Sequence, residues 1–339
     1  MAKVKDIAGL DCSGPADNMV RLVLRAQLKA MCALRDKALD WKDPEGLHDM
    51  RVLSRRLRSA ISDFKPYLRK ASLPRLKLRA IANGLRDVRD QDVALAALEE
   101  LKSKAKGPAI EGIEMLAEER RKLRKEARTA LKAAIKKIAV DDFRKEFLTK
   151  LRTITIIFPK KKRRKQTDDA APSFRGIAVE VIKARLKDFS AESQYLYLPF
   201  EIKELHQLRI LAKRLRYAIE LFSVCWGTEV EEVAKEIALL QTSLGEMHDC
   251  DVWIDSLGVR LKRTARKPKS DEDNLQLREG AAWLLKHFAR ERMEHYRDAL
   301  ARWEQWQADG FLERLILILD RDLLPAKQTA KVHAWLSQP

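Results

Sequence analysis

The sequence predicts an all-α protein that is built from a tandem duplication. The chain of 339 residues contains only 12 glycines and 11 prolines, whereas 46% of its residues are hydrophobic. This scarcity of turn-forming residues favours long helices over turn-rich β structure. In addition, an 18-residue helical pattern occurs twice, and turn signals around each copy divide the sequence into about four helices per half.

The duplication is clearest in one segment of each half. Residues 47–64 read LHDMRVLSRRLRSAISDF and residues 205–222 read LHQLRILAKRLRYAIELF, with identical residues at 10 of 18 positions. A second pair of segments, LRDVRDQDV at 85–93 and LGEMHDCDV at 244–252, follows each copy at nearly the same distance. Two matches in the same order indicate a duplication rather than chance similarity.

Turn-forming and capping residues predict the helix boundaries of the first repeat, which we place at 15–158. Proline suits the first turn of a helix, and Asp and Ser suit the position before it. The fourth helix is expected to be long and to end near Phe158, where the run ITIIF at 154–158 reads as a buried helix end or as a short strand. The four helices are expected to begin near Pro15 and Asp17, at Asp43-Pro44, at Ser72 and Pro74, and after Gly107-Pro108.

The second repeat is placed at 173–320. Between the repeats, residues 159–172 contain the basic stretch KKKRRK and have no hydrophobic period, so they read as an exposed linker. Residues 321–339 are expected to form a loosely held tail. Breaks between the helices of the second repeat are expected at Pro199, at Gly227-Thr228, between Lys267 and Ser270, and at Asp309-Gly310.

On a helix, each copy of the repeated segment separates into a cationic face and an apolar face. The cationic residues of each copy share a stripe about 80° wide at 100° per residue. We call these the motif stripes: His48, Arg51, Arg55 and Arg58 in the first copy, and His206, Arg209, Lys213 and Arg216 in the second. The opposite faces carry apolar residues that are expected to build the core, among them Leu53, Leu57 and Ile61, and Leu211, Leu215 and Ile219.

The composition of the motif stripes favours anion binding over a simple solvated surface. Solvated faces usually alternate charge sign to form i,i+4 pairs, whereas neither stripe contains a carboxylate. Arginine guanidinium groups match phosphate oxygens bidentately. Nearby phosphate would also favour the protonated forms of His48 and His206. Replacing both histidines should then remove the pH dependence of binding between about pH 6 and 8.

Overall composition restricts the classes of partner. A net charge of +18 usually marks an anionic partner. No apolar run approaches the ~18 residues of a membrane span, so no membrane partner is expected, and the first residues lack the apolar segment of a signal peptide. Cys12, Cys32, Cys225 and Cys250 lie far apart without CxxC spacing. We interpret them as core thiols of a reduced, cytoplasmic protein, with neither a zinc site nor a disulfide scaffold.

The two motif sequences resemble the CHAD domain, a histidine-containing α-helical domain associated with polyphosphate. The resemblance rests on HxxRVxxRRLRxxxxxF and HxLRxxxKRLRYAIExF, spans roughly residues 15–320 and includes the RDQDV and HDCDV segments. It implies two pseudo-twofold-related four-helix bundles that enclose a basic central groove or pore lined by the motif stripes. It further implies non-catalytic binding of inorganic polyphosphate and a cytoplasmic location associated with polyphosphate granules.

The resemblance also implies binding residues beyond the motif stripes. Lys213 supplies a point charge where an arginine is usual, and His248 stands where the first repeat has Arg89, so the two repeats are expected to contribute unequally. No cofactor is expected; divalent cations that accompany polyphosphate and the oligomeric state are left open. The additional candidate residues are Arg21, Arg25, Lys29, Arg56, Arg89, Arg121, Lys183, Arg214, His248 and Arg290.

A metal-dependent phosphohydrolase is one alternative. His206, followed by His248-Asp249 and a later aspartate, superficially resembles the ligand order of helical phosphohydrolases, in which several side chains converge on one metal ion. The first repeat has Arg89-Asp90 at the corresponding place, and arginine cannot bind a metal. We expect one aspartate of each DxD pair to anchor a neighbouring arginine or to cap a turn, and a role in holding Mg²⁺ that bridges to phosphate is left open; the pairs are Asp90 with Asp92 and Asp249 with Asp251.

Sequence-independent nucleic-acid binding is the second alternative. Polyphosphate and nucleic acid both attract cations with steep salt dependence, so charge alone does not separate them. Proteins that bind single strands interleave aromatic residues that stack on bases. Aromatic residues make up only 6% of this chain, and only Tyr217 falls near a motif stripe. Nucleic acid is therefore the less favoured partner.

Overall fold

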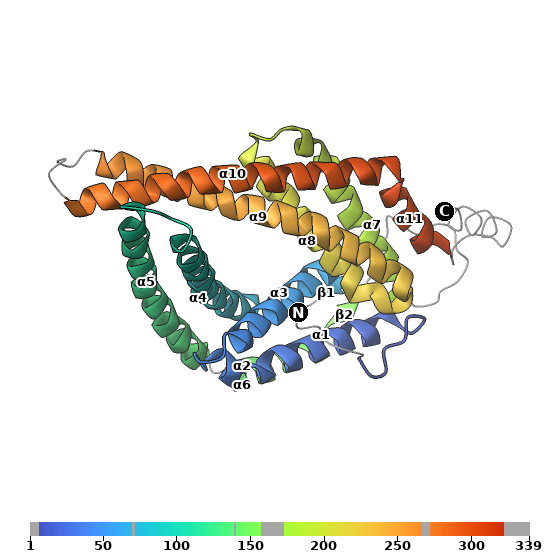
Figure 1. The fold of residues 1–339 in the computed structure, drawn as a ribbon. Coiled ribbons are helices and arrows are strands. Elements are labelled where there is room, and N and C mark those ends of the chain that lie inside the picture. Colours follow the sequence, from blue (N-terminus) through green and yellow to red (C-terminus); the bar gives the residue numbers. More distant parts are fainter. Residues whose placement is uncertain (1–6, 70–71, 139, 157–172, 266–271, 322–339) are drawn as a thin grey trace.

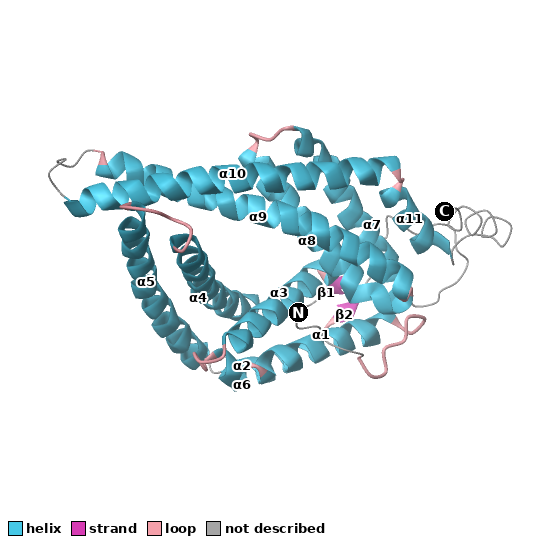
Figure 2. Ribbon diagram, in the orientation of Figure 1, coloured by secondary structure: helices cyan, strands magenta, loops and turns pink. Residues whose placement is uncertain are grey.

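The computed structural model describes residues 7–69, 72–138, 140–156, 173–265 and 272–321. These residues are almost all helical (Figure 2). The linker predicted at 159–172 and the tail predicted at 321–339 fall outside them, apart from Arg321. In chain order the elements are α1 (Ala16–Ala33), α2 (Arg35–Ala38), α3 (Pro44–Phe64), β1 (Leu68–Arg69), α4 (Arg75–Lys102), α5 (Ala109–Ile138), α6 (Val140–Arg152), β2 (Thr155–Ile156), α7 (Phe174–Glu192), η2 (Ser193–Tyr197), α8 (Ile202–Phe222), η3 (Ser223–Cys225), α9 (Thr228–Thr264), α10 (Glu272–Ala308) and α11 (Phe311–Asp320).

The helices begin close to the predicted capping residues. The Asp43 carboxylate caps α3 by accepting a hydrogen bond from the backbone N–H of Glu45 at 2.9 Å. α9 and α11 follow Gly227 and Gly310, whose φ angles of 67° and 59° lie in the region that glycine adopts without strain. The predicted helix starts at these positions are confirmed.

The predicted fourth helix of the first repeat is divided into three elements. It was expected to run from Gly107-Pro108 to near Phe158, but α5 ends at Ile138, α6 follows, and β2 begins at Thr155. β2 pairs antiparallel with β1, with Leu68 opposite Ile156. β-branched residues have higher strand propensity than helix propensity, which agrees with the strand interpretation of this run.

The two repeats share a hydrophobic core. The rings of Phe64 in α3, Phe174 in α7 and Phe222 in α8 meet with centroids 5.1–6.4 Å apart, and all three are fully buried. This larger core contains residues from helices of both repeats. A second, smaller hydrophobic cluster joins α4 and α5 of the first repeat to α9 and α10 of the second. Figure 1 shows α9 and α10 side by side along the top, α4 and α5 at the left, and α1 and α6 at the bottom. The repeats therefore depend on each other for their core.

A glycine pair allows α5 and α10 to cross at close range. A Cβ atom on Gly112 would lie 2.0 Å from the backbone oxygen of Gln276, and one on Gly280 would lie 2.6 Å from the carbonyl carbon of Gly112. No side chain can replace hydrogen at such distances. This crossing fixes a helix of the first repeat against a helix of the second.

The interpretation of all four cysteines as free thiols is wrong. Cys12 and Cys225 form a disulfide across a sequence separation of 213 residues, while Cys32 and Cys250 are free. The Arg175 backbone N–H donates to the carbonyl oxygen of Cys12 at 2.9 Å, and its side chain donates to that of Cys225 at 2.6 Å. Local spacing provides no signal for this pair, because its two cysteines lie far apart in the sequence.

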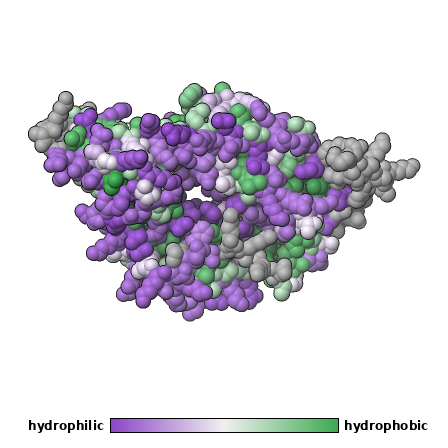
Figure 3. Space-filling model, in the orientation of Figure 1, coloured by the Kyte–Doolittle hydropathy of each residue, from purple (hydrophilic) through white to green (hydrophobic). Residues whose placement is uncertain are grey.

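The face drawn in Figure 3 is mostly hydrophilic, with small scattered apolar areas. Within the described ranges, none of the helices combines the length and the apolar character that crossing a membrane requires.

Candidate anion-binding site

Packing of α3 against α8 brings the two repeated helices together. Their apolar faces are buried as predicted, including Leu53 and Leu57 in α3 and Leu211 and Leu215 in α8. With these faces in the core, part of each motif stripe is directed toward a common depression.

Cations from three helices line a cavity of about 780 Å³. We call it the basic cavity. Asp63 is the one carboxylate among its lining residues, and the Nε of Arg185 already donates to that group at 2.8 Å. The cationic lining residues are Arg51, Arg55 and Arg58 of α3, Arg75, Arg79 and Arg86 of α4, and Lys213 and Arg214 of α8. The excess of positive charge gives the cavity a strong field for anions.

Sequence reasoning missed the contribution of α4. Arg75, Arg79 and Arg86 recur at spacings of four and seven residues, which place them on one helix face. This is the same kind of signal as the motif stripes. It was overlooked because these arginines fall between the repeated segments and have no matching copy in the second repeat.

The cations around the basic cavity lower one another's pKa values. Burial lowers the pKa of Arg51 and of Arg55, with a further decrease from neighbouring guanidinium groups. Burial also lowers the pKa of Lys213 to about 7, and the next largest causes are the charges of Arg209, Arg55, Arg51 and Arg216. A bound anion would relieve this repulsion.

Tyr217 organises three guanidinium groups behind the basic cavity. Arg216, Arg55 and Arg56 place their Cζ atoms 5.0, 5.4 and 5.5 Å from the centroid of its ring, which is within the range of cation–π attraction. Its hydroxyl group is buried, and within the described residues it has no hydrogen-bond partner. The ring therefore holds guanidinium groups, and its faces are not free to stack on a base.

Two candidate arginines are held by the same carboxylate. Glu220 pairs with Arg56 at 2.7 Å and with Arg216 at 3.4 Å. Arg216 is only 4% exposed and does not line the basic cavity. Both arginines therefore support the site from behind Tyr217, unlike Arg51 and Arg55, which line it.

The DxD aspartates do anchor arginines, as predicted. Asp251 binds Arg292 of α10 at 2.5 Å, and Asp92 lies 3.6 and 3.5 Å from Arg124 and Arg128 of α5. Their partner aspartates also approach arginines. Asp90 is 4.0 Å from Arg51, and Asp249 is 4.0 Å from Arg209.

The pKa values of three histidines are lowered in the absence of an anion. His206 and His248 face each other with their Nδ1 atoms 3.0 Å apart. Burial and the charge of Arg209 lower the pKa of both groups, that of His248 to about 4. Burial and the nearby Arg89 lower the pKa of His48 as well. A bound anion would oppose both effects and favour the protonated forms of these groups.

Several other candidate residues are located away from the basic cavity. Arg21 pairs with Asp17 at 2.9 Å and, with Arg25, lines a separate cavity between α1 and α6. Lys183 is bound to Asp320 at 2.6 Å. Lys29 on α1 and Arg290 on α10 are exposed and do not line the cavity.

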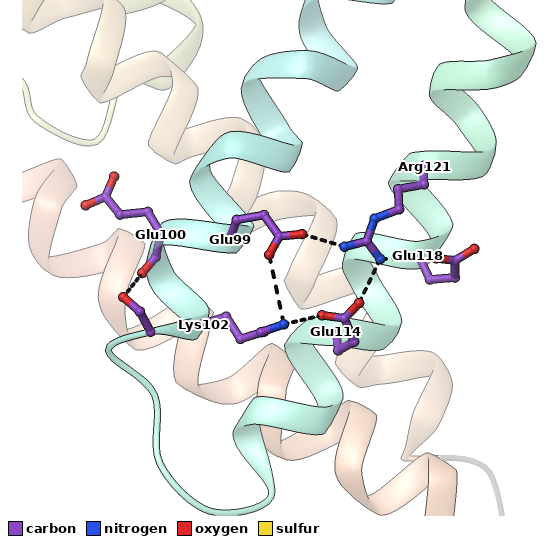
Figure 4. Close-up of polar contacts among 7 residues, drawn as sticks. Glu99, Glu100, Lys102, Glu114, Glu118 and Arg121 are labelled. Carbon is purple, nitrogen blue, oxygen red and sulfur yellow. Dashed lines mark hydrogen bonds and ion pairs between the residues drawn. The ribbon is translucent and has the colours of Figure 1, made fainter.

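Arg121 is neutralised by an acidic network. It pairs with Glu99, with Glu114 at 2.7 Å and with Glu118 at 3.1 Å, and Lys102 shares Glu114 at 2.6 Å (Figure 4). These contacts join α4 to α5, so we interpret Arg121 as a structural residue. The i,i+3 pair with Glu118 lies within α5, but the pair with Glu99 depends on the packing of α5 against α4, which the sequence alone does not show.

The described residues bring no three His, Cys, Asp or Glu side chains close enough together to hold a metal ion. Around the histidine pair, Asp249 approaches Arg209 and Asp251 is bound to Arg292. Asp249, the carboxylate that follows His248 in the suggested phosphohydrolase motif, thus lies beside an arginine in this structure.

Comparisons with known proteins agree with the resemblance in sequence. The CHAD domain family model matches residues 22–258. The fold is similar to the crystal structure of the CHAD domain from the plant Ricinus communis, with a TM-score of 0.63 and 20% identity, covering 87% of this chain and 95% of that one. It is also similar to PptA from Streptomyces chartreusis, with a TM-score of 0.62 and 16% identity, covering 86% of this chain and 100% of that one. No curated protein sequence matches the chain.

Proposed function

Since the chain belongs to the CHAD domain family, which is known for polyphosphate binding, we propose that it binds inorganic polyphosphate without catalysing its breakdown and that the basic cavity is the binding site. The observation that carries this proposal is the gathering of eight cationic side chains from α3, α4 and α8 around a cavity with a single, already paired carboxylate.

The geometry suits a flexible chain of phosphates. Cations at spacings of three and four residues lie about 5–6 Å apart along a helix, and guanidinium groups bind phosphate oxygens through two hydrogen bonds. Arg51 and Arg55 lie on one repeated helix and Lys213 on the other, so a single anion can bridge both repeats. In this proposal the motif stripes act as two walls of one basic groove between the pseudo-twofold-related bundles.

The proposal is tested by removing cations from the basic cavity without removing the helices. The variant R51Q/R55Q/K213Q removes three cationic groups, and its affinity for long-chain polyphosphate should fall about 100-fold or more at physiological salt, because each of the three lost phosphate contacts contributes about 1 kcal/mol. The matched control, K286Q/R290Q/R297Q, removes three exposed charges from α10. It should bind within about threefold of the wild-type protein. Equal losses in both variants would assign binding to overall charge.

Absence of catalysis requires its own experiment. Purified protein is incubated with polyphosphate and Mg²⁺, Mn²⁺ or Zn²⁺, and released orthophosphate is measured. We expect no release above the protein-free control. Metal-dependent release that disappears in H206Q/H248Q would instead support the phosphohydrolase alternative.

Nucleic acid is the remaining competitor. The arrangement of Tyr217 favours polyphosphate, because arginines surround the ring that would otherwise stack on bases. We also propose that binding places the protein on polyphosphate granules in the cytoplasm. A fluorescent fusion should coincide with phosphate-rich granules, and the R51Q/R55Q/K213Q variant should be diffuse.

A further inference from the structure

Lys213 is chemically distinct from the other members of the motif stripes. Its counterpart in the first repeat is Arg55, so it is the one primary amine among the eight stripe residues. It lines the basic cavity and, within the described part of the chain, forms no ion pair with a carboxylate. A cavity that attracts phosphate thus presents an amine beside guanidinium groups.

We propose that Lys213 is a site of acylation by small acyl phosphates, with the guanidinium groups of Arg51 and Arg55 holding the phosphate group of the reagent. An acyl phosphate carries its electrophilic carbonyl carbon one bond from a phosphate oxygen. Binding of the phosphate to guanidinium groups therefore brings this carbon close to the neighbouring amine.

In the free protein, the surroundings of Lys213 supply an amine that is about half deprotonated at pH 7. Burial and the surrounding cations lower its pKa to about 7. At pH 8 such an amine is about 90% neutral, whereas an exposed lysine with a pKa of about 10.4 is less than ~1% neutral. The charged and titratable groups that act on it are Arg51 and Arg55 of α3, His206, Arg209 and Arg216 of α8, and His248 of α9.

The proposed reaction is a simple acyl transfer. The neutral amine attacks the carbonyl carbon, an N–C amide bond forms, and the C–O bond to the phosphate breaks. Orthophosphate leaves with the bonding electron pair, and the surplus proton of the amine passes to phosphate or water. No oxidant, metal or further reagent is needed.

Acylation would also regulate the site, and this consequence rests on the proposed function. The amide has no positive charge, so one cation is lost from the basic cavity, and the added acyl group occupies part of its volume. We expect acetylation of Lys213 to weaken polyphosphate binding about threefold to tenfold, as expected for one phosphate contact.

The test is independent of polyphosphate. The full-length protein is incubated at pH 8 with acetyl phosphate, and acetylation of each lysine is followed over time by peptide mass spectrometry. Lys203, an exposed lysine on the same helix, serves as the internal reference. We expect Lys213 to react at least ~10-fold faster than Lys203, because of its larger neutral fraction and the bound phosphate. A rate equal to that of Lys203 would overturn the proposal.

A second arm separates phosphate docking from the reactivity of the amine. A neutral reagent, the N-hydroxysuccinimide ester of acetic acid, should show a smaller preference for Lys213 over Lys203 than acetyl phosphate does. Added pyrophosphate should protect Lys213 against acetyl phosphate but not against the neutral reagent. In R51Q/R55Q the rate at which acetyl phosphate acetylates Lys213 should fall toward the rate for Lys203. An unchanged preference in this variant, or equal preferences with both reagents, would exclude the role assigned to Arg51 and Arg55. Failure here leaves the polyphosphate measurement on R51Q/R55Q/K213Q unaffected.

Discussion

The guanidinium group of Arg51 lies 4.0 Å from the carboxylate of Asp90, and the second repeat reproduces this relationship between Arg209 and Asp249, also at 4.0 Å. Both aspartates are more than half exposed. At this distance and exposure the pairs contribute little to stability. Each carboxylate does reduce the positive potential beside an arginine of a motif stripe.

The first prediction follows from this pairing. D90N/D249N should bind polyphosphate about twofold to fivefold more tightly at moderate salt, because two negative charges near the site are removed. The measurement is a titration with long-chain polyphosphate at two salt concentrations, and the gain should shrink at the higher one. If these aspartates instead held a metal required for binding, D90N/D249N would bind more weakly.

The second prediction concerns pH. The pKa of Lys213 is lowered to about 7 in the free protein, and a bound polyanion raises it, so binding takes up a proton above pH 7. The affinity for polyphosphate should be highest below pH 7. Above pH 7 it should fall by up to about tenfold per pH unit, until the pH reaches the pKa that Lys213 has in the complex. K213R keeps its charge and should remove this dependence. A dependence that persists in K213R and disappears in H48Q/H206Q would show that the histidines are responsible.

The third prediction concerns Tyr217, which is 5% exposed. Y217A removes a buried ring that contacts three guanidinium groups, and it should lower the free energy of unfolding by about 3 kcal/mol. Y217F keeps the ring and removes a buried hydroxyl group without a partner, so its free energy of unfolding should be unchanged or higher by up to ~1 kcal/mol. Urea denaturation followed by circular dichroism measures both. A large loss in Y217F would mean that the hydroxyl group has a structural partner.

The fourth prediction concerns the Cys12–Cys225 disulfide. Because it joins positions 213 residues apart, it should restrict the unfolded chain, and its reduction should lower the free energy of unfolding by about 2–4 kcal/mol. C12S/C225S should show the same decrease and should not respond to reductant. Cys32 and Cys250 serve as controls, since C32S and C250S should keep the response of the wild-type protein. An identical stability with and without reductant would contradict the disulfide.

Signals in the local sequence were sufficient to predict where several helices begin. Asp43 before Pro44, Gly227 and Gly310 act on their immediate neighbours, so the sequence alone indicates where α3, α9 and α11 begin. The pairing of β2 with β1 depends on contacts between segments that are distant in the sequence. The same is true of the disulfide, which joins two cysteines 213 residues apart in the sequence.

The site could be predicted in part for the same reason. Helical spacing places Arg51 and Arg55 on one face without knowledge of the fold. It does not reveal that Arg121 meets Glu99 of α4 or that Lys183 meets Asp320 of α11, because these partners come from other helices. It also does not show that Tyr217 lies between guanidinium groups.

One measurement tests the central claim most directly: competition between long-chain polyphosphate and single-stranded DNA for the protein at physiological salt, with concentrations expressed per phosphate. If the basic cavity fits a bare phosphate chain, polyphosphate should displace DNA from the wild-type protein with at least ~10-fold preference. R51Q/R55Q/K213Q should lose that preference, and K286Q/R290Q/R297Q should keep it. Equal affinity for both polymers, or the same preference in all three proteins, would contradict the account.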